Sequence, residues 1–561
     1  MTLHTEANTV APIGAGGGDT HEVTNTPPTL AGHNAYDADP ALKEALHREG
    51  AGWAEDRVRK LGAQVGDPET QAKARLANRH IPEFRAYDSY GQRVDVVEYH
   101  PAYHDLMGLA MEAEVHSLAW TASEPGGHVA RAAMSYLWNQ VENGVGCPTG
   151  MAYAAVPVLK TQPETEAWAE KLLGTKYDPR LAPIAEKSSI TVATTLTEKH
   201  GGCDLRANST TAKPVNGRGA GQPYLLTGHK WFCSAPMGDI LLTTAITENG
   251  PGLFVAPRFL PDGGRNRFFI QGLKDKCGNR SNASSHIEYR DTWAVMIGEE
   301  GRGIRTAMTD VHYTRLDFAV GSSGLMRLAL SLAVHYGRHR RAFQRSLVDL
   351  PLMSNILADL ALDVEGSLAL SMRVARALDE APDDGAAAKL ARIGPPMVKY
   401  WCCKRAPGFV AEALECMGGN GYIEDAPMAR LYREAPLNGI WEGSSNMVCL
   451  DVFRAAEREP GSLEAVFAEI DAAKGANAVL DRAAGEIKDA FADKGNREFR
   501  ARRLVERLAL LWQAALLVQH APAAVSDAFV ASRIDEGHGP LFGRLRDGAG
   551  VTDILERALQ S

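Results

Sequence analysis

A single glutamate late in the chain stands where it could transfer a proton. Glu442 lies between the bulky Trp441 and Gly443 in the segment IWEGSSN. A carboxylate held beside an apolar ring and away from water has a raised pKa, which suits a general base that works near neutral pH. An exposed loop glutamate has the same local sequence, so spacing alone leaves both interpretations open.

A glycine-bearing turn could receive a flat or phosphorylated ligand. The segment LTEKHGGCDL, residues 196–205, leaves a predicted strand and carries Gly201 and Gly202. Adjacent glycines let a ligand approach the backbone closely and present N–H groups to it, and Thr197 can donate or accept a hydrogen bond. A plain hairpin loop has the same composition.

Two further segments have both a structural and a ligand-binding interpretation. Trp231, in GHKWFCS, offers a wide apolar face for a planar ligand, although a strand tryptophan usually belongs to the core. The stretch MGGNGYIED places Gly418 and Gly419 directly after a helical run, where glycine commonly ends a helix. A helix cap and a ligand contact are compatible at that position.

Composition limits the class of protein. The 561 residues are 45% hydrophobic and carry a net charge of -9, so we expect several domains and only a local patch for any nucleic acid. The eight cysteines form no CxxC pair, so we expect free thiols and no metal site. No apolar run reaches the roughly 20 residues that a bilayer requires, and the first residues do not have the pattern of a signal peptide. We expect a cytoplasmic protein that does not enter a membrane.

The order of predicted elements is helices, sheet, helices. Residues 1–32 are rich in Gly, Thr and Pro and predict a flexible tail. Residues 33–188 have a helical period, and residues 189–300 contain strand-like runs that predict an antiparallel sheet. The helical period returns in residues 301–457 as a bundle, and residues 458–561 form an appended helical domain.

Together and in this order, four segments resemble the acyl-CoA dehydrogenase family. LTEKHGGCDL is similar to its TEPxAGSD loop, GHKWFCS to its GxKxWIT strand, RHRRAFQ to its ERxxFG turn, and IWEGSSN to its YEGTxxI loop. Phrases such as RLANRHIPE and RLYREAPLN are similar to the branch that takes part in the bacterial adaptive response to DNA alkylation. The resemblance implies an α+β fold with an N-terminal helical domain, a middle antiparallel β domain, a C-terminal four-helix bundle and the appended domain.

The resemblance also implies the cofactor FAD and a reaction. Glu442 would remove the proton alpha to the thioester carbonyl of an acyl-CoA while a hydride leaves the beta carbon, and Trp441 and Arg315 would lie at the substrate. Arg340 and Phe343 match a turn that reaches the flavin of a neighbouring subunit, which implies a homo-oligomer, typically a tetramer. The implied FAD contacts are Leu196, Thr197, Gly202, Cys203, Trp231, Phe232, Cys233, Arg340, Phe343, Gly418, Gly419, Ser444 and Asn446.

Several positions depart from the family pattern. Cys203 stands at a usual serine, Cys233 at the threonine that bonds the flavin, and Trp441 at the tyrosine beside the base. The larger indole reshapes the pocket, so we expect a branched or bulky acyl chain and weak activity. The alternative is a non-catalytic flavoprotein that protects or repairs DNA.

Double-stranded DNA is the second partner that the resemblance implies, through the appended domain. Positive side chains crowd a short stretch in which Glu498 and Glu506 are the only opposing charges. Such side chains neutralise phosphates without reading bases, although a solvated helix face has the same composition. The candidates are Arg454, Arg497, Arg500, Arg502, Arg503 and Arg507.

Overall fold

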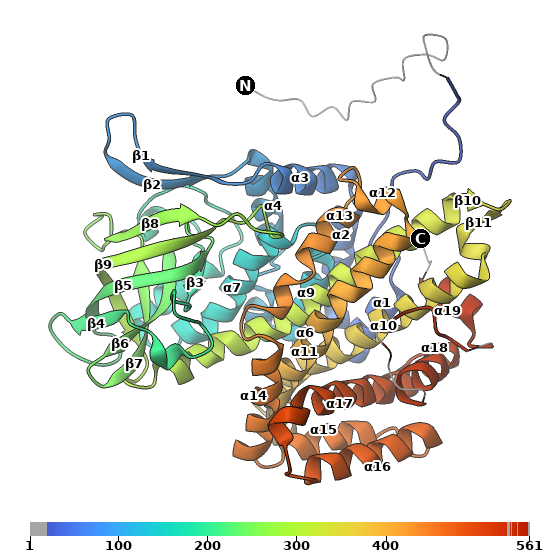
Figure 1. Ribbon diagram of the computed structural model, residues 1–561. Coiled ribbons are helices and arrows are strands. Elements are labelled where there is room, and N and C mark those ends of the chain that lie inside the picture. The colour runs from blue at the N-terminus through green and yellow to red at the C-terminus, as the bar shows by residue number, and fades with distance from the viewer. Residues whose placement is uncertain (1–19, 536–538, 540, 547, 559–561) are drawn as a thin grey trace.

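The N-terminal region is helical with one inserted hairpin. The computed structural model describes residues 20–535, 539, 541–546 and 548–558. The helices are α1 (Pro40–Arg48), α2 (Glu55–Gly66), α3 (Pro68–Arg79), α4 (Pro101–Glu112), α5 (Leu118–Thr121), α6 (Gly127–Trp138), α7 (Asn143–Leu159) and α8 (Pro163–Leu172). Strands β1 (Glu83–Tyr87) and β2 (Arg93–Glu98) form a hairpin that projects above the main sheet (Figure 1).

The middle region is a seven-stranded sheet. Its strands are β3 (Val192–Thr195), β4 (Thr211–Pro214), β5 (Pro223–Ser234), β6 (Ile240–Thr247), β7 (Gly250–Pro257), β8 (Phe268–Leu273) and β9 (Ser284–Ile297). The order is β3-β6-β4-β5-β9-β7, and an additional β6–β7 pairing closes the strands on themselves. Most pairs are antiparallel as predicted, but β6 pairs in parallel with β3 and, at one position, with β4. The chain returns to the sheet through long connections there, which permit parallel pairing.

Three long helices form the centre of the bundle. They are α9 (Gly303–His339), α10 (Pro351–Glu380) and α11 (Gly385–Cys416), followed by α12 (Gly419–Tyr422), α13 (Met428–Glu434) and α14 (Ser445–Arg458). Helix α9 contacts α10 and α11, and it also contacts α6 and α7 of the N-terminal region. By length and composition α9 could span a membrane, but 89% of its most apolar window is buried inside the protein. Its apolar surface therefore belongs to the core.

The last helices pack onto this bundle. They are α15 (Ser462–Asp471), α16 (Ala478–Ala492), α17 (Arg497–His520), α18 (Ala523–Phe529) and α19 (Val551–Ala558). Helix α17 lies along the bundle and contacts α10, α11 and α14 (Figure 1). The buried Arg533 donates from Nε to Asp363 of α10 across 3.0 Å. The hydrophobic core is thus continuous from the bundle into the appended helices.

The predicted tail is only partly described. Residues 1–19 of the predicted span 1–32 lie outside the described residues. Asn25 donates from Nδ2 to the carbonyl of Arg341 across 2.9 Å and accepts from the Arg341 N–H across 2.8 Å. The carbonyl of Pro28 lies 2.8 Å from Nε2 of His335. These contacts tie residues 25–28 to the end of α9.

Candidate active site

The candidate base stands on a constrained turn at the start of α14. Glu442 has a φ of 53° and Gly443 a φ of 97°, so two consecutive residues adopt the left-handed region. A glutamate is uncommon in that region, and such backbone strain concentrates at functional sites. The Glu442 side chain is partly buried. The turn therefore directs one carboxylate to a position that ordinary loop geometry would not favour.

Two cations from neighbouring helices hold this turn. The buried Lys399 of α11 donates from Nζ to the carbonyls of Asn438 and Gly443, each across 2.9 Å. Arg315 of α9 donates from Nε to the Glu442 carbonyl across 3.1 Å, and its Nη1 lies 2.6 Å from Asp451. The turn is thus fixed before, at and after Glu442.

The electrostatic setting of Glu442 suits a general base. Burial raises the pKa of this carboxyl, while the charges of Lys399 and Arg315 act to lower it. The net direction is upward. A raised pKa strengthens the carboxylate as a proton acceptor, which is what a general base requires.

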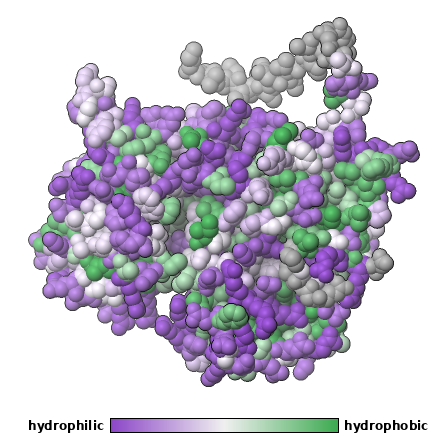
Figure 2. All heavy atoms as spheres, in the orientation of Figure 1, coloured by the Kyte–Doolittle hydropathy of each residue, from purple (hydrophilic) through white to green (hydrophobic). Residues whose placement is uncertain are grey.

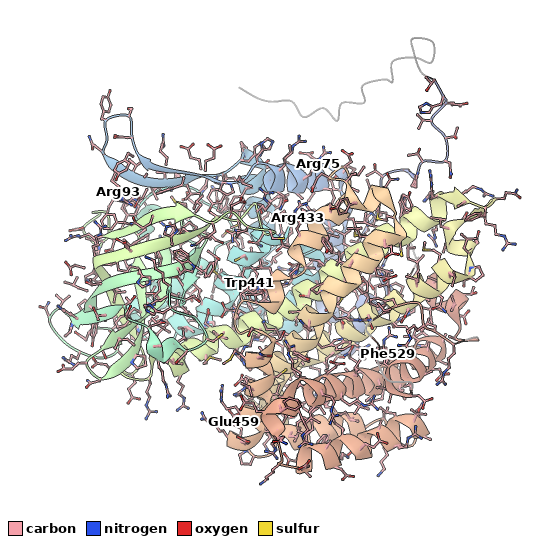
Figure 3. The ribbon with its side chains drawn as sticks, viewed as in Figure 1. Arg75, Arg93, Arg433, Trp441, Glu459 and Phe529 are labelled. Carbon is pink, nitrogen blue, oxygen red and sulfur yellow. The ribbon has the colours of Figure 1, made fainter. Side chains whose placement is uncertain are left out.

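Trp441 forms a fixed apolar wall next to the base. Its ring stacks on Phe318 with centroids 4.6 Å apart and planes 12° apart. The indole Nε1 donates to Asn438 across 3.0 Å, and Asn438 donates to Ser322 across 3.0 Å. Figure 3 places Trp441 between the sheet and the bundle, where its ring packs with the cluster that contains Cys147 of α7. This tryptophan is therefore held by stacking and hydrogen bonding.

The predicted ligand loop is attached to strand β5. The Trp231 N–H donates to the Thr197 carbonyl across 2.8 Å, and the Thr195 hydroxyl donates to the Phe232 carbonyl across 2.9 Å. A Cβ at Gly202 would come within 2.3 Å of the Thr197 hydroxyl oxygen. Glycine is therefore required at position 202 for the loop to fold back on itself. Leu196 and Thr197 are partly buried, and Cys203 is exposed.

A buried ion pair between the loop residue Glu198 and Lys230 of β5 also holds the loop of residues 196–205 in place. Glu198 lies 2.9 Å from Nζ of Lys230, and both side chains are fully buried. The charge of Lys230 and hydrogen bonds from Ser209 and Thr210 lower the pKa of Glu198 to about 2 despite burial. His200 and His229 approach Glu198 closely enough for the three to share an ion. The Glu198 oxygens already accept hydrogen bonds, which favours a structural role for this group.

The side chains of strand β5 face different environments. Phe232 is 49% exposed, and Trp231 lies under the Lys274 ammonium, 2.9 Å from the ring centroid. Cys233 was expected to line the flavin, but the structure buries it completely in the sheet core, where burial raises the pKa of its thiol to about 12. Side chains alternate along a strand, so the partly exposed Ser234 faces the other way.

The remaining predicted cofactor contacts lie elsewhere in the chain. Phe343 is 88% exposed in the turn between β10 (Arg341–Ala342) and β11 (Arg345–Ser346), at the end of the bundle away from the sheet (Figure 1). Arg340 donates to the Asn25 carbonyl across 2.7 Å. Gly418 and Gly419 are exposed at the end of α11, and Gly418 has a φ of 58°. One copy of the chain does not bring these residues to Thr197 and Phe232.

The residues of β3, of the end of β5 and of the start of α14 fit a flavin. Phe232 offers an exposed ring at the end of β5, and the buried hydroxyl of Thr194 on β3 has no hydrogen-bond partner among the described residues. Ser444 is the N-cap residue before α14, and Asn446 is exposed in the first turn of that helix, where backbone N–H groups favour phosphate. Leu196, Thr197 and Phe232 would hold the ring system of FAD, which supplies hydride acceptance when bound.

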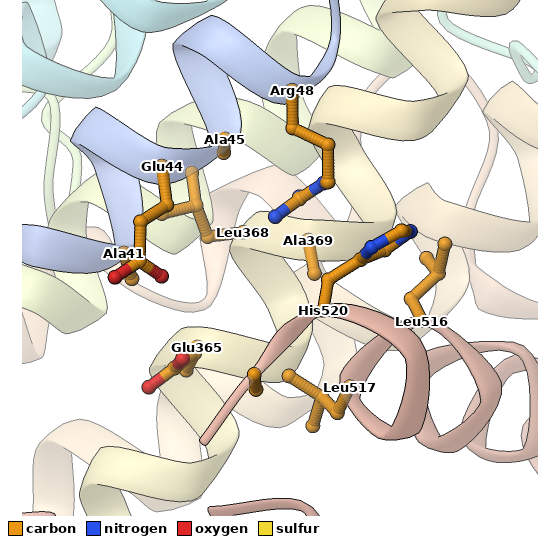
Figure 4. A pocket seen from close by; sticks show the side chains of 11 residues that line it. Ala41, Glu44, Ala45, Arg48, Glu365, Leu368, Ala369, Leu516, Leu517 and His520 are labelled. Atoms are coloured by element: carbon orange, nitrogen blue, oxygen red, sulfur yellow. The ribbon is translucent and has the colours of Figure 1, made fainter. Parts of the chain in front are cut away.

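The pocket shown in Figure 4 belongs to a different part of the molecule. It lies between α1, α10 and α17 and is lined by residues such as Glu44, Arg48 and Leu516. None of its lining residues is a predicted site residue. It is therefore separate from the candidate active site.

Four of the six predicted DNA-binding arginines are engaged within the protein, namely Arg454, Arg497, Arg500 and Arg507. Arg497 pairs with Glu457 at 3.2 Å, Arg500 donates to the Gly495 carbonyl across 2.6 Å, and Arg507 donates to the Ile534 carbonyl. Arg502 and Arg503 are exposed and form no ion pair with any residue that the structure describes.

Arg454 and Phe499 lie on α14 and α17, two helices that contact each other. Arg454 is half exposed and lies 3.7 Å from Asp451. Phe499 is 93% exposed and precedes Arg502 and Arg503 by three and four residues, so all three share one face of α17. The free positive surface is therefore smaller than the sequence predicts.

The order of helices, sheet and helices, with a carboxylate turn between sheet and bundle, defines the acyl-CoA dehydrogenase fold. Residues 25–179 match the family described as the adaptive response protein AidB N-terminal domain, and residues 301–457 match the acyl-CoA dehydrogenase C-terminal domain. The chain is 40% identical to the putative acyl-CoA dehydrogenase AidB of Escherichia coli, over 93% of this chain and 95% of that one. The chain belongs to the acyl-CoA dehydrogenase family, and its cofactor is FAD.

Two further similarities span nearly the whole chain. Acyl-CoA dehydrogenase family member 11 of Caenorhabditis elegans is 28% identical over 91% of this chain and 87% of that one. The crystal structure of Caenorhabditis elegans ACDH-11 in complex with C11-CoA has a TM-score of 0.84 at 25% identity and covers 98% of this chain and 94% of that one. The similarity therefore includes the appended helices.

Sequence reasoning missed three residues of this site. Lys399 and Asn438 hold the Glu442 turn, and Asp310 of α9 is a buried carboxyl near it. The available signal was a charged residue on a mostly apolar helical face, as at Lys399 between Val398 and Tyr400.

Proposed function

We propose that this protein is an FAD-dependent acyl-CoA dehydrogenase in which Glu442 removes the alpha proton of an acyl-CoA. The observation that carries the proposal is the Glu442 turn, held by Lys399 and Arg315 beside the ring of Trp441. A fixed carboxylate with a raised pKa is the group that alpha-proton removal requires. The C11-CoA complex of the ACDH-11 relative supports a thioester ligand for this fold.

The proposed substrate has a branched or bulky acyl chain, and turnover is weak. Trp441 stacks rigidly on Phe318, so it cannot swing away to admit a long straight chain without losing that stack. Exposed Phe343 supports an oligomer, proposed to be a tetramer, in which the β10–β11 turn reaches a neighbouring copy.

The test is an anaerobic titration of the FAD-loaded protein with a panel of straight and branched acyl-CoA esters. The proposal predicts bleaching of the oxidised flavin band by at least one branched ester. Absence of bleaching across the panel, with FAD bound, would contradict it.

A second proposed activity is the binding of double-stranded DNA. Arg502, Arg503 and Phe499 form an exposed face of α17, and Arg454 lies on the neighbouring α14. Unpaired arginines neutralise phosphates, so the binding would be independent of sequence and sensitive to salt. A duplex titration at several salt concentrations tests it, and the absence of binding at low salt would contradict it.

A further inference from the structure

Asp310 is a buried carboxyl that the reaction described above does not use. It lies on α9 with 1% of its surface exposed, and neither carboxyl oxygen has a hydrogen-bond partner among the residues that the structure describes. The nearby Thr314 hydroxyl donates to backbone carbonyls of Asp310 and Val311 instead. Buried polar groups are nearly always hydrogen-bonded, so a carboxyl without a partner indicates a missing ligand.

Asp310 lies on the part of α9 that packs near the Glu442 turn. Ala307, one helical turn earlier, packs in the same cluster as Trp441, Cys147 and Met151. Asp310 also lies near enough to Glu442 for the charge of that residue to act on it. The wall formed by α7, α9 and the Glu442 turn thus carries a second carboxyl group.

The two carboxyls differ in their surroundings. Lys399 and Arg315 act on Glu442, and they favour its ionised form. Burial raises the pKa of Asp310 well above its usual range, and the charge of Glu442 raises it further. When two neighbouring carboxyls cannot both ionise, the one with the cations loses its proton first. Asp310 is therefore the carboxyl of the pair that more readily keeps its proton, and a protonated carboxyl is an O–H donor.

We propose that Asp310 is a specificity-determining residue that donates a hydrogen bond to an oxygen atom on the acyl chain of the substrate. The substrate class is then an acyl thioester with a carbonyl, ether or hydroxyl oxygen close to the reacting carbons. A site built to hydrogen-bond such a group rejects an analogue that lacks it, because the buried donor is left without a partner. The inference rests on the proposed dehydrogenase function.

The experiment compares hexanoyl-CoA with its 4-oxo and 5-oxo derivatives in anaerobic reduction of the bound flavin. The wild type is expected to show kcat/KM at least about tenfold higher for one oxo ester. Asp310→Asn keeps an N–H donor and nearly the same shape, so it should keep the preference. Asp310→Leu is apolar and of similar size, so it should lose or reverse the preference.

Infrared spectroscopy measures the protonation of Asp310 and its contact with the ester without requiring catalytic turnover. The difference spectrum of wild type minus Asp310→Asn at neutral pH should show one carbonyl-stretch band of a protonated carboxylic acid, over the bands of other buried carboxyls such as Glu434 that both proteins share. In the Glu442→Gln variant, which should bind esters without reacting, this band should shift with the oxo ester and stay unchanged with hexanoyl-CoA.

The outcomes separate this inference from the proposed function. Reduction of the flavin by all three esters at equal rates, or equal losses for all three in Asp310→Leu, would overturn the inference and leave the dehydrogenase function standing. If no ester reduces the flavin, the dehydrogenase function fails, and the infrared shift still decides whether Asp310 contacts the chain oxygen. If the difference between wild type and Asp310→Asn contains no acid band, the inference is overturned in every case.

Discussion

Arg315 donates from Nε to the backbone carbonyl of Glu442 across 3.1 Å while its Nη1 pairs with Asp451 at 2.6 Å. The guanidinium thus hydrogen-bonds the backbone carbonyl of Glu442 and makes no hydrogen bond to the Glu442 carboxylate. The base is positioned through its backbone, and its side chain remains available to accept a proton. Lys399 likewise hydrogen-bonds backbone carbonyls of the turn, those of Asn438 before Glu442 and Gly443 after it.

Lys399→Met should move the pH profile of flavin reduction to higher pH. The Lys399 charge lowers the pKa of Glu442, so its removal raises that pKa and the base ionises only at higher pH. The rate at neutral pH should fall, with partial recovery at alkaline pH. Stopped-flow reduction across a pH series measures this.

Lys404→Met is the matched control for this variant, because Lys404 is exposed on the same helix α11. The control should leave the profile unchanged. An unshifted profile in Lys399→Met would show that the lysine has no electrostatic role at Glu442.

Lys230→Met should destabilise the protein and loosen the flavin loop. It leaves Glu198 as an uncompensated buried charge, which costs about 3–5 kcal/mol. The double variant Lys230→Met with Glu198→Gln should be less destabilised than the single one. Thermal unfolding monitored by flavin fluorescence measures both, and a double variant that melts lower than Lys230→Met would contradict this account.

Acid should weaken the same loop in the wild type. The pKa of Glu198 is about 2 in the folded protein against an ordinary 4.5, so its stabilisation is fully present above pH 4.5 and is lost as pH falls toward 2. FAD release followed by fluorescence should therefore rise over that interval. Glu198→Gln, which has no titrating carboxyl, should show a weaker dependence.

Neutralising Arg502 and Arg503 together should weaken DNA binding and its salt dependence. Each phosphate contact contributes about 0.9 to the slope of log K against log salt, so the double glutamine variant should lose about 1.8. Neutralising Arg497 and Arg500 should change the slope less, because both are engaged within the protein. Equal slopes of log K against log salt in the wild type and in both double variants would show that Arg502 and Arg503 do not contact DNA.

Phe343→Asp should lower the oligomeric state and the FAD content together. Phe343 is 88% exposed at the tip of the β10–β11 turn, and apolar side chains gather at that end of the bundle in Figure 2. Tyr90→Asp is the matched control, since Tyr90 is also 88% exposed but lies on the β1–β2 hairpin. Light scattering and the visible spectrum measure both effects, and an unchanged mass for Phe343→Asp would contradict the proposal.

The sequence pointed to the Glu442 turn through the resemblance of IWEGSSN to the family loop, because local spacing alone left an exposed loop glutamate open. A bulky aromatic, a carboxylate and a glycine stand together before a helix, and the positive φ values of Glu442 and Gly443 agree with that pattern. The helical and strand periods likewise predicted the main elements, since burial on one face follows directly from spacing.

Contacts between residues far apart in the sequence could not be predicted from local sequence patterns. Lys399 precedes the Glu442 turn by about forty residues, and the partners of Arg497 and Arg507 come from other helices. The parallel pairing of β3 with β6 depends on chain path, which periodicity does not encode. Cys233 was assigned one position too early: counted from Gly228 and Lys230, the threonine of the family motif falls on Ser234, which is partly exposed, and Cys233 falls on the preceding apolar position, which is buried.

Single-turnover reduction of bound FAD in the wild type and in Glu442→Gln tests the central claim most directly. The glutamine is isosteric and keeps its backbone contact with Arg315, so FAD content should be unchanged. We predict a roughly 100-fold to 10,000-fold slower reduction by an acyl-CoA that bleaches the wild type. Equal reduction rates in the two proteins would show that Glu442 is not the base.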